Sequence, residues 1–152
     1  RSNDGRIALV RAAQVKVVVL DVSPPVMKQS VQLAVYYIQS ACQPKNRDVW
    51  LLAPADLPTL SPAVIGKVLD AMKEGDCQVV VPVHDQRRGH PGAFSWRLAQ
   101  EVDELGKHEG INALLDRHEV RTVECGPDAI AGDIDTPEDY RAMIQRANDA
   151  TD

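Results

Sequence analysis

Three groups of polar residues in this sequence have the types and spacing to support chemistry, and the first is centred on Asp56. This residue lies in L-L-A-P-A-D-L-P-T-L (51–60), directly after an apolar run of strand length. A carboxylate in that place can bind a hard divalent cation, which takes one or two carboxylates and completes its shell with substrate phosphate oxygens. The alternative is an ordinary Asp-Leu-Pro turn in which the carboxylate bonds its own backbone, and the spacing alone favours that alternative.

The second group is the acidic cluster G-D-I-D-T-P-E-D over 132–139. Asp133 and Asp135 are two residues apart, so on an extended strand they point to the same side, where a cation would relieve their repulsion. Glu138 and Asp139 need no ligand, because the N-terminus of a helix favours acids in its first turn. That explanation suits Asp133 and Asp135 less well, since they precede the helix.

The third group is the loop 83–92, which contains His84, Arg87, Arg88, Gly89, His90 and Pro91. Guanidinium groups suit phosphate, and a glycine lets backbone N–H groups approach a ligand closely. A solvated loop between strands explains the same residues equally well. The 152 residues of the sequence include no G-x-G-x-x-G, Walker, G-x-S-x-G or H-E-x-x-H motif. The carboxylates therefore remain the main candidates for chemistry.

The elements that must position these groups alternate along the chain. Apolar runs predict strands over 15–21, 48–53, 77–81, 119–125 and 131–135, with a brief extended piece at 93–94. Periodicity and cap residues predict helices over 27–41, 62–75, 96–105, 110–117 and 136–148. Such alternation predicts an α/β fold with a mainly parallel sheet. Ligands bind at the carboxyl ends of strands in such sheets, which favours acids located there.

Composition limits the class of protein. The chain has 152 residues, the size of a single domain over 1–152, and 44% of them are hydrophobic and 26% charged. No apolar run approaches the ~18 residues of a membrane span, so we expect no membrane partner. The net charge of −5 argues against a nucleic-acid partner. Three cysteines without a C-x-x-C pair favour a reducing, cytoplasmic location, and the oligomeric state does not follow from the sequence.

Taken together and in order, three motifs resemble the MobA-like nucleotidyltransferases. They are L-L-A-P-A-D-L-P-T-L-S-P, then V-V-V-P-V followed by R-R-G-H-P-G-A-F, then G-D-I-D-T-P-E-D-Y. The likeness extends from Arg11 to Met143. The middle motif is most similar to that of the molybdenum cofactor cytidylyltransferase branch. Sugar and isoprenoid nucleotidyltransferases share the architecture.

The resemblance implies a Rossmann-like three-layer α/β sandwich and a Mg²⁺-dependent reaction. A nucleoside monophosphate would pass from CTP or GTP to a phosphorylated acceptor such as molybdopterin cofactor, releasing pyrophosphate. Asp56 and Asp135 would bind the metal and act as catalytic residues. Gly89, His90 and Pro91 would lie against the acceptor, and Ser30 would lie near the nucleotide. The alternatives are a sugar-phosphate or isoprenoid-phosphate nucleotidyltransferase, or a non-catalytic domain that has kept the fold.

The sequence does not contain the strand and glycine-rich loop with which the family begins. Members begin with a strand and a glycine-rich loop that holds the triphosphate, followed by a lysine. The resemblance therefore implies an N-terminally incomplete domain that starts inside the first helix and lacks one strand and its loop.

Overall fold

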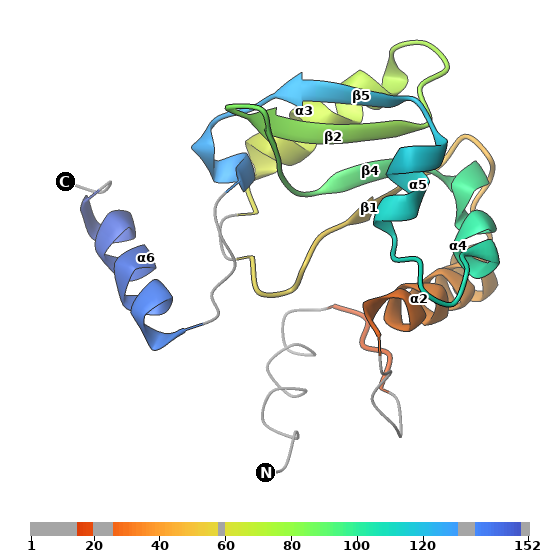
Figure 1. Cartoon of the computed structure of the whole chain (residues 1–152), viewed down its shortest axis with the longest axis horizontal. Coiled ribbons are helices and arrows are strands. Elements are labelled where there is room, and N and C mark those ends of the chain that lie inside the picture. The colour runs from red at the N-terminus through yellow and green to blue at the C-terminus, as the bar shows by residue number, and fades with distance from the viewer. Residues whose placement is uncertain (1–14, 20–25, 58–59, 131–135, 150–152) are drawn as a thin grey trace. The chain divides into compact units, whose positions relative to one another are not determined.

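The computed structural model describes residues 15–19, 26–57, 60–130 and 136–149, which fall into two compact units (Figure 1). The first unit comprises residues up to Gln43, and the second comprises residues from Pro44 onward. The predicted strand 131–135 lies outside the described residues, and so do Asp133 and Asp135.

The first unit is built on helix α2 (Met27–Cys42), which confirms the helix expected from the apolar spacing. Lys28, Val31 and Val35 are its buried residues and recur at helical intervals. The predicted strand over 15–21 is wrong in its described part, because residues 15–19 form no strand. Val15, Val18 and Val19 are exposed there. A β-branched run needs a neighbouring strand to complete its hydrogen bonds, and the described residues of this unit supply none.

The second unit is built on a five-stranded sheet. Its strands are β1 (Val49–Leu52), β2 (Val79–His84), β3 (Arg87–Arg88), β4 (Gly92–Ser95) and β5 (Val120–Glu124). The path runs β1-β4-β2-β3, and β5 also pairs with β2. Among these described strands only β2 and β5 are parallel, while the β1–β4, β2–β4 and β2–β3 pairs are antiparallel. The prediction of a mainly parallel sheet is therefore wrong, and the sheet is mixed.

A tight turn after β2 explains the antiparallel pairs. Asp85 and Gln86 have φ angles of 49° and 62°. Positive φ at both central residues is the signature of the two-residue turn that joins antiparallel strands. The turn sends the chain back as β3, and a short loop then leads into β4, which lies between β1 and β2.

Helix α3 (Pro62–Lys73) packs against one face of this sheet (Figure 1). It begins as predicted, with Ser61 at the N-cap and Pro62 following, and the Ser61 hydroxyl accepts a hydrogen bond from the Ala63 N–H at 3.2 Å. Val64, Val68 and Met72 belong to a buried cluster that includes Val80 of β2. This packing holds α3 firmly on the sheet.

The other described helices of the second unit follow β4 and β5 along the chain. They are η1 (Trp96–Ala99), α4 (Glu101–Glu104), α5 (Asn112–Arg117), η2 (Pro127–Ile130) and α6 (Pro137–Asp149). Figure 1 shows α5 on the side of the sheet opposite α3. Leu98, Val102 and Leu114 of these helices are fully buried. None of the helices in the described part of the chain is long and apolar enough to cross a membrane.

Candidate functional site

The first two sequence motifs meet at the carboxyl edge of the sheet, where β1, β2 and β5 end. Strand β4 runs antiparallel to β1, and Leu52 at the end of β1 pairs with Gly92 at the start of β4. Asp56 follows Leu52 by four residues, and His90 precedes Gly92 by two. The sheet therefore places the aspartate motif and the G-H-P motif at the same edge.

The segment that leads into the third motif lies against the G-H-P loop. The His90 N–H donates to the Ala129 carbonyl of η2 at 2.9 Å, and the Gly89 N–H donates to the Pro82 carbonyl of β2 at 2.8 Å. A Cβ atom on Gly89 would collide with the Ala129 carbonyl, so only glycine allows this close approach. Helix η2, which ends at Ile130, therefore lies at this edge.

Asp56 lies in an exposed turn, as the structural alternative predicted. It is followed by the buried Leu57, which anchors the loop. Its carboxylate has no hydrogen bond or ion pair with the described residues, so the backbone bond expected in that alternative is not found there. The carboxylate oxygens are available to a cation.

The fit of a divalent cation rests on this one carboxylate. Within the described ranges no group of three or more His, Cys, Asp or Glu side chains could hold a metal ion. A small hard cation needs only one or two protein carboxylates when substrate phosphates supply the other oxygens. Asp56 fits that requirement, and the predicted contribution of Asp135 lies outside the described residues.

The other predicted site residues differ in their surroundings. Gly89 and Pro91 are buried, whereas His90 between them is exposed at the edge of the sheet. The peptide bond between His90 and Pro91 is cis. Ser30 is exposed on α2 in the first unit, and its location near the nucleotide stays a prediction.

The structure also reveals a charged pair that sequence reasoning missed. His84 ends β2 and Glu124 ends β5, and the His84 Nδ1 lies 3.0 Å from the Glu124 Oε1. The hydrogen bond that the His84 ring donates to the Glu124 carboxylate raises the pKa of His84 above its usual value, and the nearby charge of Asp85 acts in the same direction. The two residues are 40 positions apart, so only the parallel register of β2 and β5 could have predicted the pair.

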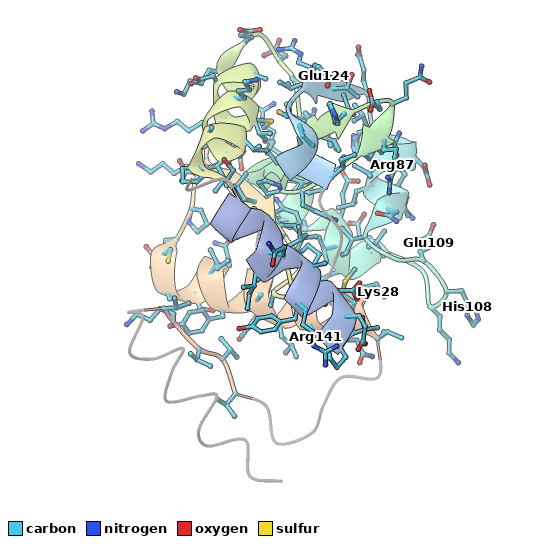
Figure 2. The ribbon with its side chains drawn as sticks, turned by 90° about the vertical axis from the view of Figure 1, so that its left-hand side faces the viewer. Lys28, Arg87, His108, Glu109, Glu124 and Arg141 are labelled. Carbon is cyan, nitrogen blue, oxygen red and sulfur yellow. The ribbon has the colours of Figure 1, made fainter. Side chains whose placement is uncertain are left out.

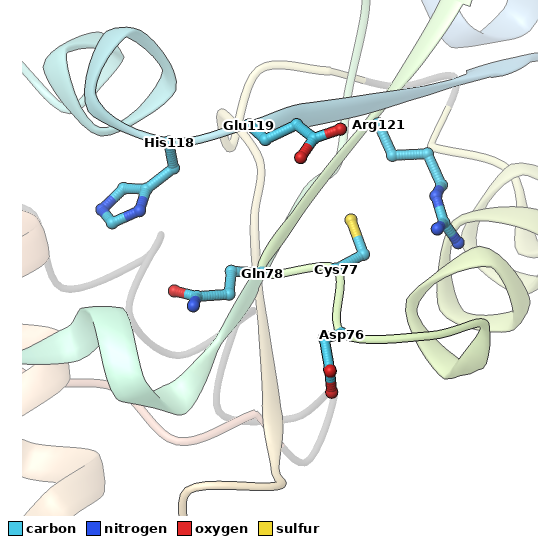
Figure 3. Close-up of a pocket in the computed structure, with 6 residues that line it drawn as sticks. All are labelled: Asp76, Cys77, Gln78, His118, Glu119 and Arg121. Atoms are coloured by element: carbon cyan, nitrogen blue, oxygen red, sulfur yellow. The ribbon is translucent and has the colours of Figure 1, made fainter.

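A cavity of about 330 Å³ lies at the opposite edge, at the amino ends of β2 and β5 (Figure 3). Its lining residues are Asp76, Cys77, Gln78, His118, Glu119 and Arg121. The Arg121 guanidinium donates to the carbonyls of Ala71 and Glu74 and so caps the end of α3. His118 pairs with Glu101 at 2.8 Å. Arg121 and His118 therefore have structural partners, and neither the Asp56 motif nor the G-H-P motif lies at this edge.

Comparison with known proteins finds a matching family model and a similar curated protein. The family model described as MobA-like NTP transferase domain matches residues 2–122. A phosphoenolpyruvate guanylyltransferase of Rubrobacter xylanophilus is 35% identical over 100 residues, which are 61% of this chain and 46% of the relative. The chain therefore spans about half the length of the curated relative it matches.

Solved structures show the same fold. Rv0371c from Mycobacterium tuberculosis is 25% identical with a TM-score of 0.65, over 93% of this chain and 72% of that one. The manganese complex of Rv0371c is 26% identical with a TM-score of 0.64, over 93% and 73% of the two chains. Molybdopterin-guanine dinucleotide biosynthesis protein A from Archaeoglobus fulgidus is 16% identical with a TM-score of 0.62, over 97% and 76%, which is a likeness of fold alone.

Proposed function

Because the chain belongs to the MobA-like NTP transferase family, a family of nucleotidyltransferase enzymes, we propose that it transfers a guanylyl group from GTP to phosphoenolpyruvate. The observation that carries the proposal is the meeting of the Asp56 and G-H-P motifs at one edge of the sheet. The guanylyltransferase from Rubrobacter xylanophilus supports the choice of nucleotide and acceptor. Cytidylyl transfer to molybdopterin becomes the alternative. The Archaeoglobus fulgidus protein is only 16% identical to this chain and so supports the fold alone, not the acceptor.

The reaction requires little covalent chemistry from the protein itself. An oxygen of the acceptor phosphate attacks the α-phosphorus of GTP, the bond from that phosphorus to the bridging oxygen breaks, and pyrophosphate leaves. A bound divalent cation would neutralise the charge that develops on the phosphates. Asp56 would hold this cation, and Asp135 would be its second carboxylate. The manganese complex of Rv0371c supports a divalent ion in this fold.

The remaining residues of the edge would orient the acceptor. We give the name acceptor loop to Gly89, His90 and Pro91, which carry the G-H-P motif. The loop is fixed by backbone hydrogen bonds to β2 and η2 and exposes the His90 side chain. A rigid loop beside the metal ligand would favour transfer by holding the two reactants in line.

The test is pyrophosphate release by the full-length gene product. GTP and CTP are each offered with phosphoenolpyruvate or with molybdopterin, in Mg²⁺ or Mn²⁺ and after chelation. We expect release with GTP and phosphoenolpyruvate, lowered at least about hundredfold by chelation. Turnover of CTP with molybdopterin in place of this pair would establish the alternative. An absence of release with every pair would overturn the proposal and leave a transferase for sugar or isoprenoid phosphates and a non-catalytic domain as the alternatives.

A further inference from the structure

We propose that His84 and Glu124 are positioning residues that hold the acceptor loop against η2, so that loosening their pair weakens use of the acceptor and not of the nucleotide. The inference rests on the proposed function, because it assigns the acceptor to this loop. It adds two residues to which neither the motifs nor the family resemblance gives a role.

The pair closes the end of the parallel ladder between β2 and β5. Val83 is the register partner of Glu124, and the Cys125 N–H donates to the Val83 carbonyl at 2.8 Å. The His84 ring then reaches the Glu124 carboxylate at 3.0 Å. A side-chain contact thus continues the strand pairing beyond the point where both strands end.

Each member of the pair begins one of the two segments that form the loop and its support. After His84 the chain turns back through β3, which has only two residues, and enters the acceptor loop. After Glu124 the chain enters η2, whose Ala129 carbonyl accepts the hydrogen bond from His90. The His84–Glu124 contact therefore adds a side-chain link to the backbone hydrogen bond from His90 to Ala129 that joins the two segments.

Two carboxylates beside His84, those of Glu124 and Asp85, favour its protonated form, and two basic residues also lie in its surroundings. The Asp85 carboxylate lies 3.7 Å from its Nε2, and Arg87 is its register partner in β3. Figure 2 shows Arg87 and Glu124 toward the same end of the second unit. From α3, the Lys67 ammonium lies 3.5 Å from the Glu124 carbonyl oxygen. The Cys125 thiol behind the pair stays neutral, since burial raises its pKa.

The sign of the pH dependence follows from these charges. The hydrogen bond that His84 donates to the Glu124 carboxylate raises the pKa of His84 in the folded protein. The stabilisation is therefore fully present below the unfolded pKa of about 6.5 and is lost as pH rises through the folded value. We expect the acceptor loop to loosen over that range of pH.

The first measurement is hydrogen exchange at the Gly89 and His90 amides, with Glu124→Gln as the variant. The protection factors of the wild-type protein should fall as pH rises through the pKa of His84. In Glu124→Gln they should be about threefold lower at low pH and nearly independent of pH, as for the loss of a partly exposed ion pair. The matched control is Glu119→Gln, the same change at the other end of β5, which should leave both amides unchanged.

The second measurement is steady-state kinetics of the same proteins. Glu124→Gln should raise the KM for phosphoenolpyruvate about threefold and leave the KM for GTP unchanged. An equal rise in both KM values, or wild-type protection of both amides in Glu124→Gln, would overturn the inference. If the wild-type protein releases no pyrophosphate, the proposed function and the acceptor assignment both fail. The exchange data would then still show whether the pair holds the loop.

Discussion

Gly89 is the residue of the second unit whose surroundings most clearly require a glycine. A Cβ atom there would collide with the backbone carbonyl of Ala129, which cannot turn aside as the end of a long side chain could. The two backbone hydrogen bonds of Gly89 and His90 hold the loop in that contact. The glycine of the G-H-P motif therefore has a packing role before any ligand is considered.

Gly89→Ala should lower the free energy of unfolding by about 1–3 kcal/mol, the usual cost of forcing an extra methyl group into packed surroundings. Urea denaturation of both proteins measures this difference. Gly110→Ala is the control, because no atom lies within 4 Å of a Cβ atom at Gly110. Equal stabilities for Gly89→Ala and the wild-type protein would show that Ala129 can yield.

Sequence reasoning at this scale located Asp56 and the G-H-P loop but missed the partner of His84. Asp56 and the G-H-P loop belong to short motifs whose residues are neighbours in the chain, so their types and spacing are visible in the sequence. His84 and Glu124 are 40 positions apart and meet only through the β2–β5 register. A contact of that kind cannot be read from residue types and spacing.

At the scale of elements, helices were better predicted than strand directions. The apolar spacing of α2 and the Ser61-Pro62 start of α3 are local signals, and both helices form as expected. The direction of β3 and β4 depends on the turn at Asp85 and Gln86, both at positive φ. Turns of this type usually contain glycine or asparagine, and Asp85-Gln86 contains neither, so the residue types did not indicate a mixed sheet.

Ser61→Ala should lower the free energy of unfolding by about 1 kcal/mol, because the Ala63 N–H at the start of α3 loses its acceptor. Thermal or urea denaturation measures the change. Ser61→Asp should restore most of the loss, since aspartate also caps helices well. A stable Ser61→Ala protein would mean that another group or water replaces the hydroxyl.

At the scale of the whole molecule, the two edges of the sheet in the second unit have different roles. The carboxyl edge carries Asp56, the acceptor loop and the His84–Glu124 pair, which lie at or next to the ends of strands. At the amino edge, Arg121 of the cavity caps α3 and His118 pairs with Glu101. The general preference of ligands for the carboxyl ends of strands is the reason why we expect the site at the first of these edges. The predicted site is incomplete in the described residues, because Asp135 lies outside them and Ser30 belongs to the first unit.

The most direct test of this account compares the same substitution at the two edges of the sheet. Asp56 and Asp76 are both exposed, and Asp76 lines the cavity at the amino edge. Pyrophosphate release from GTP and phosphoenolpyruvate would be measured for Asp56→Asn and Asp76→Asn in the full-length gene product, with melting temperatures for both. We expect at least about a hundredfold loss of turnover for Asp56→Asn, because the proposed metal ligand is removed, and near wild-type turnover for Asp76→Asn. Near-normal turnover of a folded Asp56→Asn protein would contradict this account.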